Sequence, residues 1–170
     1  AKQIIGYIPD RPYLYEKLTA KEFLAFTAGI YGIEYKRQVP KAKELLELFG
    51  LAGWANELVE SYSHGMKQRL TMAAALIHDP RLLIVDEPMV GLDPHGAVLV
   101  KKLFRDMCGE NGGTVFLSTH TLEVAEELCD RVAIINHGSV IIEGSMDEIR
   151  QQVGAEQSSH LYELFLKLTS

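Results

Sequence analysis

The feature that most constrains the fold of this 170-residue chain is a run of four apolar residues, at positions 82–85, that ends at two carboxylates. A short continuous apolar run is typical of a strand buried on both faces of a parallel sheet. Asp86 and Glu87 follow where that strand leaves the core, and open α/β sheets bind ligands beyond the carboxyl ends of their strands. The pair therefore predicts a ligand site at this edge or, more simply, two acids that cap the next turn.

After Ser63 the chain alternates between strand and helix patterns. Further strands are predicted at residues 4–8, Thr114–Ser118 and Val132–Asn136. Helices are predicted at residues 65–77, at residues 121–129, and between them on a stripe of Leu103, Phe104 and Met107. Alternating strands and helices imply a parallel sheet covered on both faces. The predicted fold class is therefore α/β.

A helical block from residue 14 to residue 60 interrupts this alternation. Thr19 and Glu22 have the spacing of a capping box, which predicts the start of a helix. A second helix is expected to begin near Pro40, since proline suits a first turn, and to end near Gly50. Its apolar stripe is predicted to consist of Leu45, Leu48 and Phe49.

The last forty residues carry signals for a hairpin and two helices. His137 and Gly138 join two β-rich runs as a hairpin turn, and residues 145–148 form another capping box. A final helix is predicted at residues 159–168, after a linker-like stretch at 154–158. Its stripe is Leu161, Leu164, Phe165 and Leu168. Earlier in the chain, residues 111–113 are expected to form a turn.

Composition excludes several classes of protein. The net charge of −6 and the pI of about 5.5 argue against a nucleic-acid binder, which usually carries a basic stripe. No apolar run approaches the 18 residues of a membrane span, and no signal peptide opens the sequence, so a cytosolic protein is expected. Cys108 and Cys129 fall within helical patterns and are expected to be buried free thiols. The start at Ala1, close to a strand, is interpreted as a cut within a longer polypeptide.

Three further motifs surround the Asp86–Glu87 pair. Ser63 is placed to cap a helix whose free N–H groups and dipole favour an anion, although an ordinary N-cap has the same pattern. Asp93 and Pro94 have the residue types of an N-cap and first helical position. His120 follows a second buried strand, where a lone histidine is most often a surface or capping residue.

Taken in order, the four motifs resemble the second half of an ATP-binding-cassette (ABC) ATPase, the motor subunit of ABC transporters. They are residues 62–68 (YSHGMKQ), 82–88 (LLIVDEP), 91–94 (GLDP) and 118–120 (STH). The resemblance covers nearly the whole chain and implies a P-loop NTPase-like sheet with an inserted α-helical subdomain. The first motif departs from the usual Ser-Gly-Gly-Gln signature, because His64 replaces the first glycine and Met66 the glutamine.

The resemblance assigns a role to each motif around ATP and Mg²⁺. Asp86 corresponds to the Walker B aspartate that holds the metal, and Glu87 corresponds to the catalytic base. His120 corresponds to the switch histidine that contacts the γ-phosphate. Ser63 and Gly65 correspond to the signature that meets the nucleotide of the opposite subunit.

Two further positions carry expectations from the family. Asp93 belongs to the D-loop, which communicates across the dimer interface. Asp10, after the first strand, occupies the place of the Q-loop glutamine that meets Mg²⁺ and the attacking water, although it could be a plain loop residue. Some ABC ATPases related to antibiotic-resistance exporters look similar here. Tyr13, Leu14 and Tyr15 are coupling contacts or simple packing.

No G-x-x-x-x-G-K-[ST] phosphate loop occurs in the sequence. The family places that loop's strand between the strands matched by Thr114–Ser118 and Val132–Asn136, so an incomplete sheet with a gap between these two strands is expected. The chain is therefore interpreted as a partial ABC ATPase domain over residues 1–170. Within it, a helical subdomain is expected at 14–60, the C-terminal half of the core at 61–150, and a C-terminal helix at 151–170.

The resemblance implies the motor subunit of a transporter, with ATP and Mg²⁺ as cofactors and a second ATP-binding subunit in a homodimer or heterodimer. Membrane-spanning subunits are the other expected partners and nucleic acid is not, which implies a cytoplasmic location peripheral to the inner face of the membrane. The chain alone is expected to be inactive without the phosphate loop. The alternative is a non-catalytic interaction module. A soluble ABC protein of translation or DNA repair is less favoured, since tandem cassettes and long coiled-coil insertions are absent.

Overall fold

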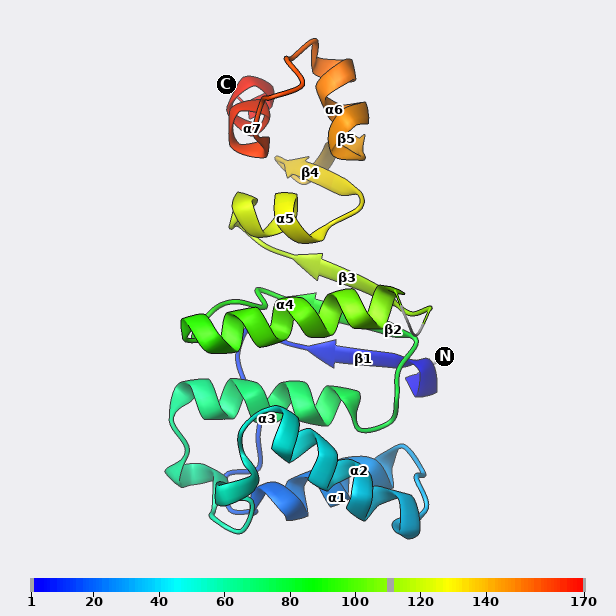
Figure 1. Cartoon of the computed structure of the whole chain (residues 1–170), viewed down its shortest axis with the longest axis vertical. Helices are drawn as coiled ribbons and strands as arrows, with labels where there is room; N and C mark the ends of the chain where they lie inside the picture. Colours follow the sequence, from blue (N-terminus) through cyan, green and yellow to red (C-terminus); the bar gives the residue numbers. More distant parts are fainter. Residues whose placement is uncertain (1, 110–111, 170) are drawn as a thin grey trace. The chain divides into compact units, whose positions relative to one another are not determined.

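The computed structural model describes residues 2–109 and 112–169, and the chain divides into two compact units, Ala1–Ser118 and Thr119–Ser170 (Figure 1). The first unit contains a parallel sheet with the longer helices, and the second contains a hairpin with three short helices. The predicted turn at 111–113 begins at Asn111, outside the described residues.

Three parallel strands form the sheet of the first unit. Strands β1 (Ile5–Ile8), β2 (Leu82–Asp86) and β3 (Thr114–Ser118) lie side by side in that order. The strand predictions are confirmed, except that Ile4 belongs to a short 3-10 turn, η1 (Lys2–Ile4). Ile8 is level with Val85, and Val85 with Leu117, so the strands end together at one edge.

The two faces of this sheet differ in burial. Ile8, Leu83 and Val85 point to one face and are buried. Tyr7 and Phe116, level with Ile84 on the other face, are 56% and 67% exposed. The expectation that helices cover both faces is therefore wrong for the described residues.

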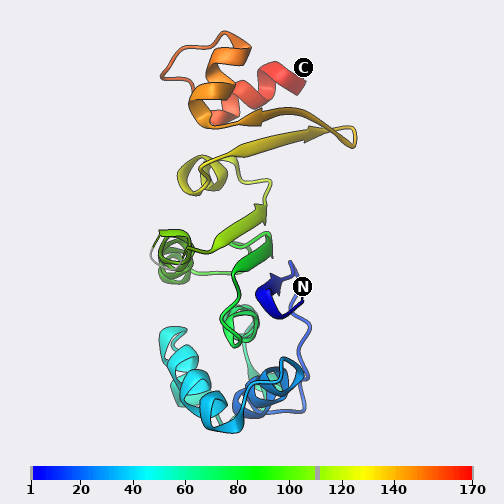
Figure 2. The same cartoon turned by 90° about the vertical axis from the view of Figure 1, so that its right-hand side faces the viewer.

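The order of the strands explains why only one face is covered. The chain moves across the sheet in one direction, from β1 to β2 and from β2 to β3. Right-handed crossovers in one direction place their helices on the same face. These helices are α3 (His64–Leu76) and α4 (Pro94–Gly109), which lie on one side of the strands in Figure 2 and pack beside β1 and β3.

Two helices precede α3 in the first unit. Helix α1 (Ala20–Ile30) begins at Thr19, whose hydroxyl accepts from the Glu22 N–H while the Glu22 carboxylate accepts from the Thr19 N–H, so the predicted capping box is confirmed. Two short turns, η2 (Ala52–Trp54) and η3 (Val59–Ser61), lead from the second helix to α3.

Helix α2 (Tyr35–Leu48) begins one turn earlier than predicted. Pro40 lies inside it rather than at its start. A proline in the second turn forgoes one intrahelical hydrogen bond, and the buried stripe beyond it outweighs that loss. The stripe is Ala42, Leu45, Leu46 and Phe49, whereas the predicted Leu48 is exposed.

The second unit is built on an antiparallel hairpin. Strands β4 (Val132–Asn136) and β5 (Ser139–Gly144) pair with each other, and both central residues of the turn have positive φ, 48° at His137 and 78° at Gly138. These signs match a type I′ turn and confirm the predicted hairpin. Among the described strands, β3 pairs with β2 and β4 pairs with β5, and the expected gap between β3 and β4 stays a prediction.

Three helices pack with this hairpin: α5 (Leu122–Leu128), α6 (Met146–Val153) and α7 (Leu161–Thr169). The predicted capping box at Ser145 and Glu148 is confirmed. The predicted stripe of α7 is also confirmed, with Leu161 and Leu164 fully buried. Phe165 and Leu168 pack against the same cluster.

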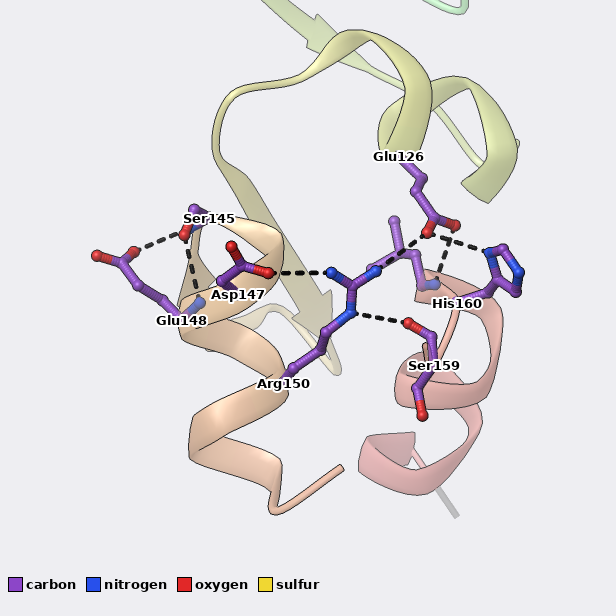
Figure 3. A network of polar contacts seen from close by, with 8 residues as sticks. Glu126, Ser145, Asp147, Glu148, Arg150, Ser159 and His160 are labelled. Atoms are coloured by element: carbon purple, nitrogen blue, oxygen red, sulfur yellow. Dashed lines mark hydrogen bonds and ion pairs between the residues drawn. The ribbon is translucent and has the colours of Figure 1, made fainter. Parts of the chain in front are cut away.

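A polar network joins these helices (Figure 3). Glu126 of α5 accepts from the Leu161 N–H at 3.1 Å and lies 3.5 Å from an Arg150 guanidinium nitrogen. Arg150 also donates to the Ser159 carbonyl at 2.9 Å and pairs with Asp147. A carboxylate from another helix thus supplies the cap that α7 needs at its N-terminus.

Two expectations about single features can be checked directly. Neither Cys108 nor Cys129 is joined in a disulfide. The expected burial is wrong for Cys108, which is exposed near the end of α4, whereas Cys129 is half-buried and packs against the apolar cluster of the second unit. Among the described residues, no helix combines the length and apolarity needed to span a membrane.

Candidate active site at the carboxyl edge of the sheet

Asp86, the last residue of β2, is held by the neighbouring strand. It is level with Ser118 of β3, and the Ser118 hydroxyl donates to its Oδ1. The backbone ladder continues one step further, since the Glu87 N–H donates to the Ser118 carbonyl at 3.0 Å. The Asp86 carboxylate is thereby fixed at the edge where the strands end.

Glu87 has a left-handed backbone, with φ at 49°. Such a conformation costs a residue with a Cβ about 1 kcal/mol and is concentrated at functional sites. The Glu87 carbonyl accepts from the Val90 N–H at 3.2 Å, which closes a turn directly after the strand. The chain therefore reverses at Glu87 and does not continue as sheet.

Asp10 follows β1 by two residues at the same edge. Because Ile8 is level with Val85, both segments leave the sheet at the same edge, and the first of them bends at Asp10. The Asp10 side chain is half-buried. The structure thus brings the predicted Asp10, Asp86 and Glu87 to one edge of one sheet.

The N-terminus of α3 lies toward this edge. The helix runs antiparallel to the strands, so its start lies on the side to which the strand arrows point (Figure 1). The Ser63 hydroxyl accepts from the Met66 N–H at 3.3 Å, which confirms the predicted cap. Gly65 touches the loop after Glu87, since a Cβ added there would lie 3.1 Å from the Gly91 carbonyl oxygen.

Side chains outside the predicted set fix the start of α3. Lys67 forms an ion pair with Glu16, and the Lys67 ammonium lowers the pKa of that carboxyl. Arg69 donates to the Gly65 carbonyl at 3.3 Å and to the Phe49 carbonyl at 3.2 Å, which ties α3 to the end of α2. The Lys67–Glu16 and Arg69–Phe49 contacts join residues distant in sequence, so the sequence carries no local signal for them.

Asp93 caps α4 as predicted. Its Oδ1 accepts from the Gly96 N–H at 2.6 Å, and the helix begins at Pro94. His120 follows β3 by two residues and belongs to the second compact unit. Its role at the site therefore stays a prediction.

Ser118 is a partner that the sequence reasoning did not assign. The strands Leu82–Asp86 and Thr114–Ser118 have equal length, and their last residues are level. Aligning the two predicted strands end to end would have paired Ser118 with Asp86. Counting the register was therefore the missing step.

The residues at this edge fit Mg²⁺ held through water. Mg²⁺ keeps several waters and needs only one or two carboxylates together with phosphate oxygens. Asp86 supplies a fixed carboxylate oxygen, and Ser118 adds a hydroxyl beside it. Among the described residues, no group of three or more His, Cys, Asp or Glu side chains is placed to hold a metal ion.

Of the three candidates for coupling contacts, Tyr13, Leu14 and Tyr15, the last already contacts another ring of the chain. Its ring meets Phe26 edge-on, with centroids 5.2 Å apart. Tyr13 is 83% exposed, and Leu14 is half-buried. The Tyr15 ring is nevertheless 59% exposed, so the coupling role stays a prediction for Tyr13, Leu14 and Tyr15.

Comparison with known proteins decides the family. The model of the family described as "ABC transporter" matches residues 1–90, which is more than half of the chain. This chain belongs to the ABC transporter family. Its ATP-binding relatives include an uncharacterized ABC transporter ATP-binding protein of Nostoc, 41% identical over 94% of this chain and 47% of the relative.

Two named relatives come from resistance and transport systems. The bacitracin transport ATP-binding protein of Bacillus licheniformis is 41% identical over 87% of this ABC chain and 47% of the relative. The linearmycin resistance ATP-binding protein of Bacillus subtilis is 39% identical over 92% of this chain and 50% of the relative. The chain spans about half the length of the curated relatives it matches.

Solved structures confirm the P-loop NTPase-like α/β fold. A structure described as the ATP-binding subunit of an ABC transporter matches 99% of this chain and 70% of its own length, with a TM-score of 0.91 and 34% identity. A dimeric ATP-binding cassette in a post-hydrolysis state, bound to ADP and Pi, matches with a TM-score of 0.76 and 26% identity, over 84% of this chain and 62% of its own.

Proposed function

We propose that this chain is part of the ATP-hydrolysing motor subunit of an ABC transporter. The observation that carries the proposal is the carboxyl edge, where Asp86 is fixed by Ser118 and Glu87 begins a strained turn. Bound Mg²⁺ would supply positive charge to the β- and γ-phosphates of ATP.

Each residue at this edge has one task in the proposal. Asp86 holds the metal through water, and Glu87 accepts the proton of the attacking water. Asp10 accepts a hydrogen bond from metal-bound water in place of an amide. His120 contacts the γ-phosphate.

The proposed active form is a head-to-tail dimer over two nucleotides. In that form Ser63 and Gly65, at the start of α3, face the γ-phosphate bound to the opposite subunit, where free N–H groups and the helix dipole favour an anion. Asp93 communicates between the two sites. The dimeric state of one solved relative supports this arrangement, and both a homodimer and a heterodimer fit it.

The proposed setting is the cytoplasmic face of a membrane, where the subunit couples hydrolysis to transport through membrane-spanning partners. Residues 14–60 would grip those partners, residues 61–150 would form the C-terminal half of the catalytic core, and residues 151–170 would end the domain. The names of the bacitracin and linearmycin relatives favour transport of an antibiotic-like compound.

The 170 residues alone are proposed not to turn over ATP. The edge supplies a metal carboxylate and a base, but phosphoryl transfer depends on positioning and charge stabilisation of all the phosphates. No G-x-x-x-x-G-K-[ST] is present in this sequence to hold the α- and β-phosphates. Calorimetric titration of the chain with Mg·ATP tests this point: a Kd below roughly 10 μM, about −7 kcal/mol, would contradict it.

Glu87→Gln in the complete protein tests the central assignment. The amide keeps the shape of the side chain but cannot take a proton from water, so ATP binding is kept and steady-state hydrolysis falls below about a tenth of wild type. The ATP-bound dimer becomes more stable, because two carboxylates no longer face two γ-phosphates. Glu156→Gln, at an exposed carboxylate outside the helical subdomain and the catalytic core, is the matched control and leaves hydrolysis unchanged.

Either outcome of that experiment separates the alternatives. Hydrolysis above a tenth of wild type in Glu87→Gln would remove the base assignment. A complete wild-type protein without any hydrolysis would favour the non-catalytic interaction module instead.

Asp10 is tested by two substitutions in the same protein. Asp10→Gln provides the amide usual in the family and removes one negative charge near the phosphates, so hydrolysis is retained. Asp10→Ala leaves no oxygen to meet metal-bound water, and hydrolysis falls further. Equal rates in the two variants would make Asp10 a plain loop residue.

A further inference from the structure

The His64 ring occupies the space beside Gly91. A Cβ added at Gly91 would lie 2.4 Å from His64 Cδ2 and 2.6 Å from Nε2. Real Cβ atoms never come so close, so the ring packs directly on the glycine Cα. Gly91 also has φ at 77°, a conformation that glycine adopts freely.

The first turn of α3 and the loop around Gly91 meet at a second point. A Cβ added at Gly65 would lie 3.1 Å from the Gly91 carbonyl oxygen. The first turn of α3 therefore contacts the loop around Gly91 through both His64 and Gly65. The backbone of Gly91 takes part in both contacts, against the His64 ring in the first and against Gly65 in the second.

The Gly91 loop leads to Glu87 through consecutive turns. The Glu87 carbonyl accepts from Val90, and the Met89 carbonyl accepts from the Leu92 N–H at 3.4 Å. One end of the segment is fixed to β3 by the Glu87 N–H, and the other end is fixed to α4 by the Asp93 cap. Because both ends of the segment are held, a displacement of Gly91 is expected to move Glu87 as well.

We propose that His64 is a positioning residue for Glu87, acting as a spacer between the start of α3 and the catalytic turn of the same subunit. The proposal rests on the proposed function. His64 itself does not need to touch nucleotide. The volume of its ring sets the distance between the first turn of α3 and the loop around Gly91. The histidine that interrupts the usual signature thereby links Ser63, which faces one nucleotide of the dimer, with Glu87, which serves the other.

A double-mutant cycle on the complete ATPase tests the contact. His64→Gly removes the spacer, and because misplacing a catalytic group by about 1 Å can cost as much as 100-fold, kcat is expected to fall about tenfold with KM for Mg·ATP nearly unchanged. Gly91→Ala places a methyl group against the ring and lowers kcat as well. In the His64→Gly background the same Gly91→Ala change is expected to cost at least about fivefold less.

His64→Phe separates the ring's volume from its other properties. A phenyl ring fills similar space without nitrogen atoms, so it should restore most of the rate lost in His64→Gly. A Phe variant as slow as the Gly variant overturns the spacer. If the loss of kcat in the double variant equals the product of the losses in His64→Gly and Gly91→Ala, the spacer is overturned as well.

A readout without ATP keeps this inference distinct from the proposed function. In the 170-residue chain, Gly91→Ala should lower the thermal midpoint less in the His64→Gly background than in wild type. One possible result is that the two substitutions lower the thermal midpoint non-additively while a Glu87→Gln enzyme still hydrolyses ATP. That pair of results would reject the base assignment and leave the His64–Gly91 contact standing. If the two substitutions lower the thermal midpoint additively, the contact itself is rejected.

Discussion

The two faces of the three-stranded sheet are similar in composition and differ in surroundings. One face carries Ile8, Leu83 and Val85, all buried beneath α3 and α4. The other carries Tyr7 and Phe116, both largely exposed in this chain. Apolar character alone therefore does not decide burial here; the direction in which the chain crosses the sheet does.

The open face also ends in the candidate site. Asp86 and Ser118 are level with each other and point to the same side as Ile84 and Phe116, two residues before them on their strands. The Asp86 carboxylate thus lies at the end of the face that carries Tyr7 and Phe116, while the covered face packs against the helices behind it. Substitutions on the two faces should have very different effects.

The largest effect is expected from Leu83→Ala on the covered face. Leu83 is fully buried, and its truncation leaves a cavity, so the free energy of unfolding should fall by about 3 kcal/mol. Ile84→Ala, the half-buried neighbour that points to the open face, is the control, with an expected loss of about 1 kcal/mol. Urea unfolding of the chain followed by circular dichroism measures both. Equal losses would show that the two faces are equally packed.

Gly6→Ala should be the next most damaging change. A Cβ at this position would lie 2.7 Å from the Ala75 carbonyl oxygen of α3, and backbone cannot move aside cheaply. The expected loss is about 2 kcal/mol, typical of overpacking. Gly53→Ala, where an added Cβ meets nothing within 4 Å, is the matched control. A tolerated Gly6→Ala would mean that α3 lies less closely on the covered face.

A smaller, pH-dependent effect is expected from His78, in the turn between α3 and β2. Its ring stacks on Tyr31 and contacts the Ile5 carbonyl at 3.0 Å, and burial lowers the pKa of His78, although the Ile5 hydrogen bond and Asp79 partly oppose this. The unfolded chain then binds more protons, so stability decreases as the pH falls below about 6.5.

The pH dependence of urea unfolding between about pH 5 and pH 8 checks this prediction. His78→Gln should flatten the decrease at low pH, whereas His95→Gln, at an exposed histidine of α4, should leave it unchanged. If stability decreases at low pH as much in His78→Gln as in wild type, other groups cause the decrease.

The smallest effect is expected from Phe116→Thr on the open face. The ring is 67% exposed, so in the 170-residue chain the free energy of unfolding should change by less than about 0.5 kcal/mol. The same substitution in the complete protein sharpens the comparison, because a larger cost there would show that another segment covers this face. A cost above about 1 kcal/mol in the short chain would contradict the open face.

Much of the local structure could be predicted because its causes are local. The strand at Leu82–Asp86 follows from one apolar run, and the starts of α1 and α6 follow from capping boxes only four residues long. The early start of α2 was missed because burial of Leu46, which depends on tertiary packing, outweighs the signal of Pro40.

In the candidate site, too, some residues have a local sequence signal and some contacts do not. Asp86, Glu87 and Asp10 could be named because each follows a predicted strand, and the register brings the three to one edge. The Ser118 hydroxyl on Asp86 and the His64 ring on Gly91 depend on strand register and loop packing. Aligning the two predicted strands end to end could have found the first contact, whereas the second joins distant segments and leaves no pattern in a single sequence.

The left-handed backbone of Glu87 implies a trade-off between stability and activity. Glycine is the residue best suited to φ at 49°, and Glu87→Gly would relieve about 1 kcal/mol of backbone strain. The same change would remove the proposed base. Selection for a more robust fold and selection for turnover therefore act in opposite directions at this single position.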